Sequence, residues 1–578
     1  MNHKKTTNKK TIKYKEPKKK SIGGRSKNDK KINRWVWLAL AVVIITTFAI
    51  YLKAIHFEIF YCWDDNVYIR ENSFIKALHW ENIKSIFSTF YFGNYHPFTT
   101  LFYAIEYKTG HGDFSVFHFN NILLHLINTV LVFVFIRKIS PSNQAVALIT
   151  AAFFAVHPMH VESVAWVSER KDVLYTFFFL LSLIFYSDYL KSQKIKHLLL
   201  AFFLFVFSCF SKSAAVVLPW ILLLLDYYAG RKISRKMFLE KIPFFIISLI
   251  FGIVAIYSQK SSGAIQNMAP AMTFMEHLAT ISYSFITYLF KAFIPVGLSA
   301  YYPYPAGLGS ALPFIYYLSI LILALLAFFV WYSRKWGKDI VFGFLFFVIT
   351  IILVLQIIPI GAASMAERYT YIPYIGLFFI VGKLFETSSG TVKAGKKLKN
   401  GLLIVLALGF ITFSAITNER VKKWENEEIL FSEVIARHPG VGIAYLNRGN
   451  YYYSYYANTL FVNDFFKRKT HIEKAAHDFE SALKCDLSKD NKVKAYFNLG
   501  TAKKDLGDYT GAIKDLDSAI KIDNGYYNAY NNRGAAKYMV NDYQGAIDDW
   551  NRAIELNPHL TEAISNRDTL TRILKTKK

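Results

Sequence analysis

Two adjacent acids, Asp64 and Asp65, have the residue type and the position that a catalytic task at a membrane surface requires. They directly follow the first long apolar segment of the chain, so they lie close to where the chain leaves a bilayer. Desolvating a carboxylate is costly and shifts its pKa, and perturbed carboxylates favour functional sites. We interpret the pair as a candidate general base. The alternative is a solvated loop that happens to be acidic.

Four basic residues stand on later loops that we predict to lie on the same, outer side, against the usual excess of positive charge inside. Transfer of a sugar from a lipid phosphate needs a base for the acceptor hydroxyl and cations for the leaving phosphate. The acids could supply the first and the basic residues the second. The alternative is that each cation pairs with an acid such as Glu169 or Glu367. The four are Arg170, Lys171, Lys212 and Arg368.

His157, His160 and Glu162 have a spacing that could be read as a set of metal ligands. Pro158 interrupts the helix that would bring them together, and no further ligands stand out. We therefore assign no residue to a metal site, and whether the reaction requires a metal stays open. A role in hydrogen bonding or substrate positioning is favoured over metal binding, and histidines that merely lie at a membrane interface are favoured over both.

The composition indicates a multi-pass membrane protein. Of the 578 residues, 53% are hydrophobic and 17% aromatic, and apolar runs of membrane-spanning length recur between residues 35 and 416. The net charge of +27 could suggest nucleic-acid binding. However, the Lys and Arg residues cluster in short segments between the apolar runs, as cytoplasmic loops do, and no nucleic-acid motif accompanies them. We expect no nucleic-acid partner.

The order of the segments predicts an all-α membrane domain followed by a soluble helical domain. Residues 1–34 form a basic tail, expected to be disordered and cytoplasmic. Residues 35–417 carry about eleven crossings, with a first outer loop at about 55–117. The stretch 278–312 is rich in Pro and Gly towards its end, and we expect that 278–294 does not cross cleanly. Residues 418–578 then lie on the outer side of the cell membrane.

Internal repeats are the clearest signal in residues 418–578. The triplet Asn498-Leu499-Gly500 recurs as Asn532-Arg533-Gly534, and further matching positions keep the same offset of 34 residues. Small residues at fixed positions let paired helices pack closely. This pattern resembles the tetratricopeptide repeat, an α-solenoid that mostly binds peptide segments in its concave face. We expect the repeats to bind acceptor proteins.

A wider family resemblance rests on the acidic first loop and four later stretches, namely 154–165, 170–174, 212–219 and 367–373. Together they resemble the transmembrane-and-tetratricopeptide O-mannosyltransferases and their bacterial relatives, over most of residues 35–420. The resemblance implies a C-type glycosyltransferase that uses a polyprenyl-phosphate sugar donor. It also implies inversion at the anomeric carbon, transfer to Ser or Thr of a protein, and Asp64 or Asp65 as the base.

The same resemblance implies that donor phosphate and sugar contact several outer loops. The chain departs from the family pattern in three places: His96 stands where Arg is common, 169–172 replaces a Gly-Arg-Ala-Asp stretch, and Ser213 replaces an acid. The sugar, mannose in the family's name, and the acceptor therefore stay open. The expected contact residues are His96, His157, His160, Glu162, Arg170, Lys171, Asp172, Lys212 and Arg368.

Two other functions remain compatible with the sequence. Some ligases and polymerases of lipid-linked polysaccharide also carry C-terminal repeats, but they are expected to place key basic residues in a large late outer loop, and this chain has no obvious one. A membrane scaffold that gathers secreted proteins through its repeats is the non-enzymatic alternative.

Overall fold

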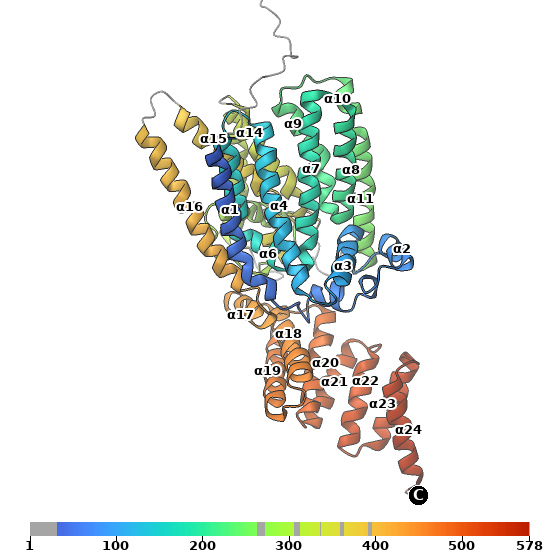
Figure 1. Cartoon of the computed structure of the whole chain (residues 1–578). Coiled ribbons are helices and arrows are strands. Elements are labelled where there is room, and N and C mark those ends of the chain that lie inside the picture. Colours follow the sequence, from blue (N-terminus) through green and yellow to red (C-terminus); the bar gives the residue numbers. More distant parts are fainter. Residues whose placement is uncertain are drawn as a thin grey trace, which may run out of the picture.

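The computed structural model describes residues 32–262, 272–305, 312–335, 337–358, 363–390 and 396–576. Nearly all of the predicted basic tail, and residues 306–311 of the Pro- and Gly-rich stretch, lie outside these ranges. The described chain forms a helical bundle with an array of shorter helices attached to one end (Figure 1). This division follows the change of composition along the sequence.

The bundle contains sixteen α-helices within the described ranges. They are α1 (Arg34–Tyr51), α2 (Trp80–Ser88), α3 (Pro97–Thr109), α4 (Ser115–Ile139), α5 (Gln144–Ala155), α6 (Val161–Ala165), α7 (Arg170–Ser192), α8 (Ile195–Ser211), α9 (Leu218–Tyr228), α10 (Arg235–Leu239), α11 (Ile242–Ser261), α12 (Phe274–Lys291), α13 (Phe314–Ser333), α14 (Lys338–Ile351), α15 (Tyr374–Gly390) and α16 (Lys396–Lys422). Short 3-10 or π turns connect several of them: η1 (Leu52–His56), η2 (Asn66–Arg70), η3 (Ser73–Ile75), η4 (Pro158–His160), η5 (Val167–Glu169), η6 (Ser213–Val217), η7 (Ile352–Val354) and η8 (Glu367–Thr370).

Among the described residues, six helices are long and apolar enough to cross a membrane. A seventh is present if α5 and the following Pro158–Ala165 segment, bent by 56° at Pro158, form one broken span. These criteria do not account for the eleven predicted crossings, because α8, α9 and α14 are apolar but shorter than a full span. Helix α12, which covers most of 278–294, is not among the spans. The six are Arg34–His56, Ser115–Ile139, Val167–Ser192, Arg235–Ser261, Phe314–Ser333 and Lys397–Lys422.

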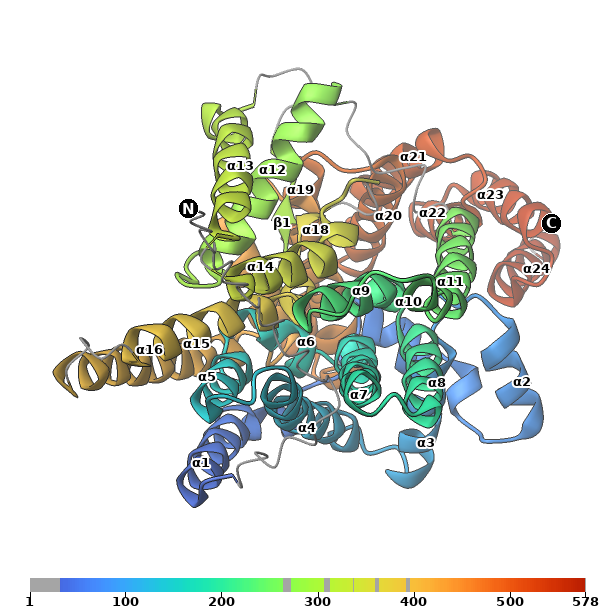
Figure 2. The ribbon, with the colours of Figure 1, turned by 90° about the horizontal axis from the view of Figure 1, so that it is seen from above.

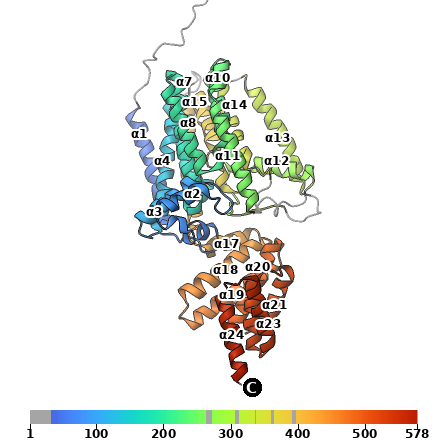
Figure 3. The same ribbon diagram turned by 90° about the vertical axis from the view of Figure 1, so that its right-hand side faces the viewer.

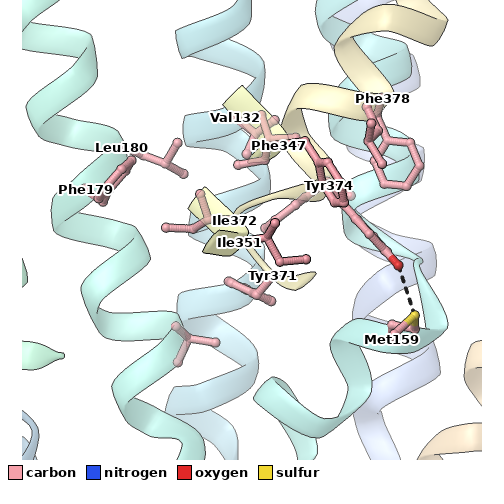
Figure 4. Close-up of a cluster of buried hydrophobic side chains, with 14 of the residues drawn as sticks. Val132, Met159, Phe179, Leu180, Phe347, Ile351, Tyr371, Ile372, Tyr374 and Phe378 are labelled. Carbon is pink, nitrogen blue, oxygen red and sulfur yellow. Dashed lines mark hydrogen bonds between the residues drawn. The ribbon is translucent and has the colours of Figure 1, made fainter. Parts of the chain in front are cut away.

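The interior of the bundle is built from aromatic and branched side chains. Helix α7 packs between α4 and α8, as the view along the bundle shows (Figure 2). In another part of the core, the hydroxyl of Tyr374 at the start of α15 lies 3.1 Å from the sulfur of Met159 (Figure 4). The same hydroxyl donates to the carbonyl oxygen of Tyr288 at 2.6 Å. A buried phenol needs such partners, because an unsatisfied hydroxyl in an apolar core is destabilising.

Helices α14 and α15 cross with their backbones in direct contact. Gly343 and Gly376 lie at the crossing, and a Cβ atom at either would collide with the carbonyl oxygen of the other. Small residues permit this close approach between helices in a membrane. The crossing fixes the start of α15, and therefore also η8, which precedes it.

Two short strands are the exception to the predicted all-α architecture. β1 (Tyr302–Pro303) pairs antiparallel with β2 (Ala363–Met365). The pairing brings the chain after α12 against the segment that leads into η8. Ser364 adds a side-chain bond to the carbonyl of Pro303 at 3.1 Å.

The array consists of antiparallel helix pairs. Gly500 faces Leu516, and Gly534 faces Trp550 at the equivalent place one repeat later; an added Cβ would lie 2.7 and 2.8 Å from these side chains. The glycines therefore act as packing contacts, as the 34-residue repeat predicts. The helices are α17 (Glu427–Arg437), α18 (Gly442–Tyr451), α19 (Phe465–Leu483), α20 (Lys489–Asp505), α21 (Tyr509–Ile522), α22 (Tyr527–Met539), α23 (Tyr543–Leu556) and α24 (Thr561–Thr576), with the π-helical η9 (Tyr452–Leu460) after α18.

The array touches the first loop of the bundle. Helices α2 and α3 lie at the end of the bundle that faces α17 (Figures 1 and 3). The hydroxyls of Tyr451 and Tyr455 donate to the carboxylate of Glu58 at 2.5 and 3.2 Å. These direct contacts place the first loop and the array at the same end of the bundle, and we therefore predict that both lie on one side of the membrane.

A topology experiment tests this arrangement. We expect an epitope tag inserted at Gly112, in the turn between α3 and α4, to be accessible from the same side as a tag at the carboxyl terminus. Protease protection in sealed vesicles gives the measurement, with a tag in the turn between α9 and α10 as the control for the opposite side. Opposite accessibility of the Gly112 and carboxyl-terminal tags would contradict the contact described here.

Candidate active site at the first loop

Asp65 is buried and serves as an anchor for the first loop. One carboxylate oxygen accepts from the backbone N–H of Phe60 at 3.2 Å. The other accepts from the backbone N–H of Ser168 at 2.9 Å and from the Ser168 hydroxyl. Burial raises the pKa of Asp65 to about 6, and these hydrogen bonds oppose that rise. The carboxylate thus ties the loop to the turn η5 just before α7.

Asp64 has a different environment. It is partly exposed, and in the part of the chain that the structure describes its carboxylate makes no hydrogen bond or ion pair. Its charged neighbours are Lys171 and Arg368, which favour the carboxylate, and Glu169, which disfavours it. Desolvation by burial is the largest effect and raises the pKa of Asp64 above its usual value. Asp64 is therefore the acid that remains available to another molecule.

Three cations from three separate elements surround the carboxylate of Glu169. Lys171 Nζ lies 3.0 Å from it, Arg368 Nε 3.3 Å and Lys212 Nζ 3.7 Å. Lys171 belongs to α7, Lys212 to the junction of α8 with η6, and Arg368 to η8. Glu169 is therefore the acid that these three cations share. We call these four residues the Glu169 cluster.

Two further acids orient the cations of this cluster. The buried Glu162 accepts from the backbone N–H of Arg368 at 2.9 Å and also from its guanidinium group. Asp172 pairs with Lys212 at 2.5 Å and accepts from the Ser163 hydroxyl at 3.2 Å. The predicted contact residues Glu162 and Asp172 thus hold other predicted residues in place.

A cavity of about 210 Å³ opens beside the Glu169 cluster. Lys171, Lys212 and His96 form its polar end, whereas α11 supplies a mostly apolar wall that includes Phe251 and Val254. Burial and the two nearby lysines lower the pKa of His96 to about 3, so its imidazole is neutral. The cavity therefore combines an apolar wall with a cationic end.

Arg170 lies away from the cavity. Its side chain is fully buried, where it pairs with Glu106 and donates to the side chain of Asn121 and to the carbonyl of Phe117 at 2.6 Å. These partners come from α3 and α4. The neighbouring Lys171 points to the cluster instead, because successive residues of a helix face different directions. Arg170 has a packing role in this structure.

His157 and His160 also lie outside the cluster. Both are fully buried, and each has a ring nitrogen near a backbone carbonyl, that of Ala292 at 3.2 Å and that of Phe154 at 2.8 Å. Aromatic rings, including that of Tyr374, surround them. No group of three or more His, Cys, Asp or Glu side chains in the described ranges could hold a metal ion.

Two residues of this site were not among the predicted contacts. Glu169 was expected only as a pairing partner of a cation, yet it accepts from three of them. Ser168 bonds Asp65 through both its N–H and its hydroxyl. Their position directly before the predicted cations was the available sequence signal. This sequence position did not reveal which side chains from distant loops contact Ser168 and Glu169.

Comparisons with known proteins agree with the resemblance. Residues 96–258 match the family described as dolichyl-phosphate-mannose-protein mannosyltransferase, and residues 527–560 match the tetratricopeptide repeat. The chain is 30% identical over 146 residues to the protein O-mannosyl-transferase Tmtc1 of Drosophila melanogaster, which covers 25% of this chain and 17% of that protein. The human protein O-mannosyl-transferase TMTC1 is 37% identical over 95 residues, 16% of this chain and 11% of that protein.

A longer alignment links the chain to a protein O-mannosyl-transferase of Caenorhabditis elegans. It is 24% identical over 377 residues and covers 63% of this chain and 52% of that protein. The chain thus spans about half the length of this relative, and less of the other two. These matches indicate distant homology to protein O-mannosyl-transferases, with a mannosyltransferase-type segment and tetratricopeptide repeats.

The Arg170 pair gives a stability prediction. We expect Arg170→Ala to lower the free energy of unfolding by about 3–5 kcal/mol, because it leaves the Glu106 carboxylate buried without its partner. Thermal unfolding of the purified protein in detergent measures the effect. The double variant Arg170→Met with Glu106→Gln removes both charges and should be more stable than Arg170→Ala. An Arg170→Ala protein as stable as the wild type would refute the packing role.

Proposed function

We propose that this chain, a distant homologue of the protein O-mannosyl-transferases, is a membrane glycosyltransferase that moves a sugar from a polyprenyl-phosphate donor to Ser or Thr hydroxyls of proteins. Mannose is the sugar that the matched family uses, by its description. The observation that carries the proposal is the cavity, because its cationic end and apolar wall suit a phosphate attached to a lipid chain. The cavity shares Lys171 with Asp64, because this lysine lines the cavity and is also a charged neighbour of the Asp64 carboxylate.

In this reaction Asp64 is the general base. It takes the proton from the acceptor hydroxyl as that oxygen attacks the anomeric carbon. The bond between that carbon and the phosphate oxygen breaks, and the phosphate leaves with the electron pair. Attack from the face opposite the phosphate inverts the anomeric carbon. The raised pKa of Asp64 strengthens it as a base, provided that the pH keeps it ionised.

The Glu169 cluster stabilises the leaving phosphate. Lys171 and Lys212 reach the cavity, and their N–H donors can face the phosphate oxygens as negative charge develops there. Arg368, held by Glu162, adds a third cation from η8. The neutral His96 can contribute one hydrogen bond at the cavity wall, without charge. Fixed cations in a partly dehydrated site act more strongly than they would in water.

The array serves the acceptor in this proposal. Tetratricopeptide helices commonly bind extended peptide segments, and the array contacts the loop that carries Asp64. We propose that it presents acceptor proteins to the bundle. With the basic tail in the cytosol, the first loop and the array would lie on the extracytoplasmic side of the cell membrane.

Replacing the two aspartates separately tests the assignment of the base. We expect Asp64→Asn to lower kcat by about 100-fold or more, because general-base catalysis contributes roughly 10²–10⁴-fold. Thermal stability should stay unchanged, since Asp64 holds no other group. Asp65→Asn should instead destabilise the protein, because an amide group cannot accept all three hydrogen bonds. The assay follows sugar transfer from a polyprenyl-phosphate mannose to a Ser/Thr peptide.

The pH profile provides an internal control for the same assignment. If Asp64 is the base, the wild-type rate falls as pH falls through its pKa, and the fall begins above the usual pKa of an aspartate because burial raises that value. Wild-type kcat in Asp64→Asn would refute the assignment.

Lys212 tests the phosphate contact. We expect Lys212→Met to raise KM for the lipid-linked donor by about 10-fold or more, the effect of losing a hydrogen bond to a charged group, while KM for the acceptor stays unchanged. Lys191→Met is the matched control, since Lys191 is exposed at the far end of α7 and bonds only the carbonyl of Lys138. An unchanged donor KM in Lys212→Met would contradict a phosphate at this end of the cavity.

A further inference from the structure

Glu427, in the first turn of the array, binds the first loop of the bundle through two consecutive backbone groups. Its carboxylate oxygens accept from the N–H of Tyr61 and from the N–H of Cys62, each at 2.8 Å. Glu427 is fully buried. The bound amides lie two and three residues before Asp64, and a carboxylate with both oxygens engaged fixes position and direction together.

Stacked aromatic rings surround this contact. Trp63, directly before Asp64, stacks on Trp166 with ring centroids 4.3 Å apart and lies parallel to Trp424 at 6.4 Å. Trp424 stands between α16 and α17, at the base of the array. In addition, the N–H of Glu58 donates to the carbonyl of Glu425 at 3.3 Å. The residues before Asp64 thus rest on the junction between bundle and array.

We propose that Glu427 is a positioning residue for the catalytic loop, so that the first helix of the array forms part of the catalytic unit. This inference rests on the proposed role of Asp64. The hydrogen bond from Ser168 to Asp65 attaches the loop to the bundle. The hydrogen bonds from Tyr61 and Cys62 to Glu427 attach it to the array. Asp64 lies between the two attachments and has none of its own, so its place depends on both.

The neighbouring acid Glu428 provides a matched control. It stands on the same turn of α17, but it accepts from the hydroxyls of Tyr452 and Tyr456, both inside the array. A change at Glu428 alters the packing of the array without touching the loop. A change at Glu427 acts on the loop directly.

Kinetics separate a positioning role from a merely structural one. We expect Glu427→Ala to lower kcat by about 10- to 100-fold, because small displacements of a reacting group have effects of that order. KM for the polyprenyl-phosphate mannose donor should change little, since Glu427 does not line the cavity. Glu427→Gln should fall between Glu427→Ala and wild type, because its amide oxygen still accepts one of the two N–H groups. Glu428→Gln should keep kcat within about twofold.

Cys62 provides a readout that does not depend on activity. In a Cys485→Ser background, a membrane-impermeant maleimide should label Cys62 slowly in wild type, because burial raises the pKa of its thiol. Glu427→Ala and Glu427→Gln both remove a negative charge that helps to raise this pKa, so the position of the loop is read from the difference between the two variants. We expect Glu427→Ala to label faster than Glu427→Gln, because only Glu427→Gln keeps an acceptor for the loop, and Glu428→Gln to label at the wild-type rate. The remaining Cys209 is buried in the bundle. Thermal unfolding identifies any variant that fails to fold, in which case the isosteric Glu427→Gln decides.

The outcomes distinguish this inference from the proposed function. Equal labelling of Glu427→Ala and Glu427→Gln, together with an unchanged kcat in Glu427→Ala, would overturn the positioning role, even if Asp64 proves to be the base. If wild type transfers no sugar, the proposed function fails, and the difference in labelling between Glu427→Ala and Glu427→Gln then decides whether Glu427 holds the loop.

Discussion

The arrangement of the site depends on one buried carboxylate, that of Glu169, which accepts from three cations. A charge of this kind cannot stay unpaired at a membrane boundary, because desolvation would cost several kcal/mol. Lys171, Lys212 and Arg368 come from three elements, so α7, the α8–η6 junction and η8 must converge on it. The cavity lies beside this convergence, between Lys171 and Lys212 on one side and α11 on the other.

The two adjacent aspartates show how environment separates identical side chains. Asp65 has three donors around it and little exposure, so its carboxylate is used up in holding the loop. Asp64 has charged neighbours, but no group in the described residues donates a hydrogen bond to its carboxylate. The carboxylate is therefore free to accept a proton. Burial raises the pKa of both. What differs is the number of fixed hydrogen bonds, and that difference is the basis for proposing Asp64, and not Asp65, as the base.

Repeats and segment order were predictable from the sequence because they depend on local periodicity. The 34-residue offset identified the helix pairs, and the early acidic loop was identified from its position after the first span. The crossings were less predictable, since α9 and α14 are apolar yet short.

His157, His160 and Arg170 carry polar side chains that look available in sequence, but tertiary packing buries them. Glu169 and Glu427 were not expected as site residues, because their partners lie far away in the chain.

The first loop itself explains why distant partners matter here. Between η1 and α2 it contains only short turns, so its own backbone bonds do not fix where Asp64 points. Its position comes from Ser168, which belongs to the bundle, and from Glu427, which belongs to the array. Deleting either side would remove one of two attachments while leaving the acid in the sequence. On the proposed mechanism, the bundle supplies the charged cavity and the array completes the geometry of the base, so catalysis would be a property of the two parts together.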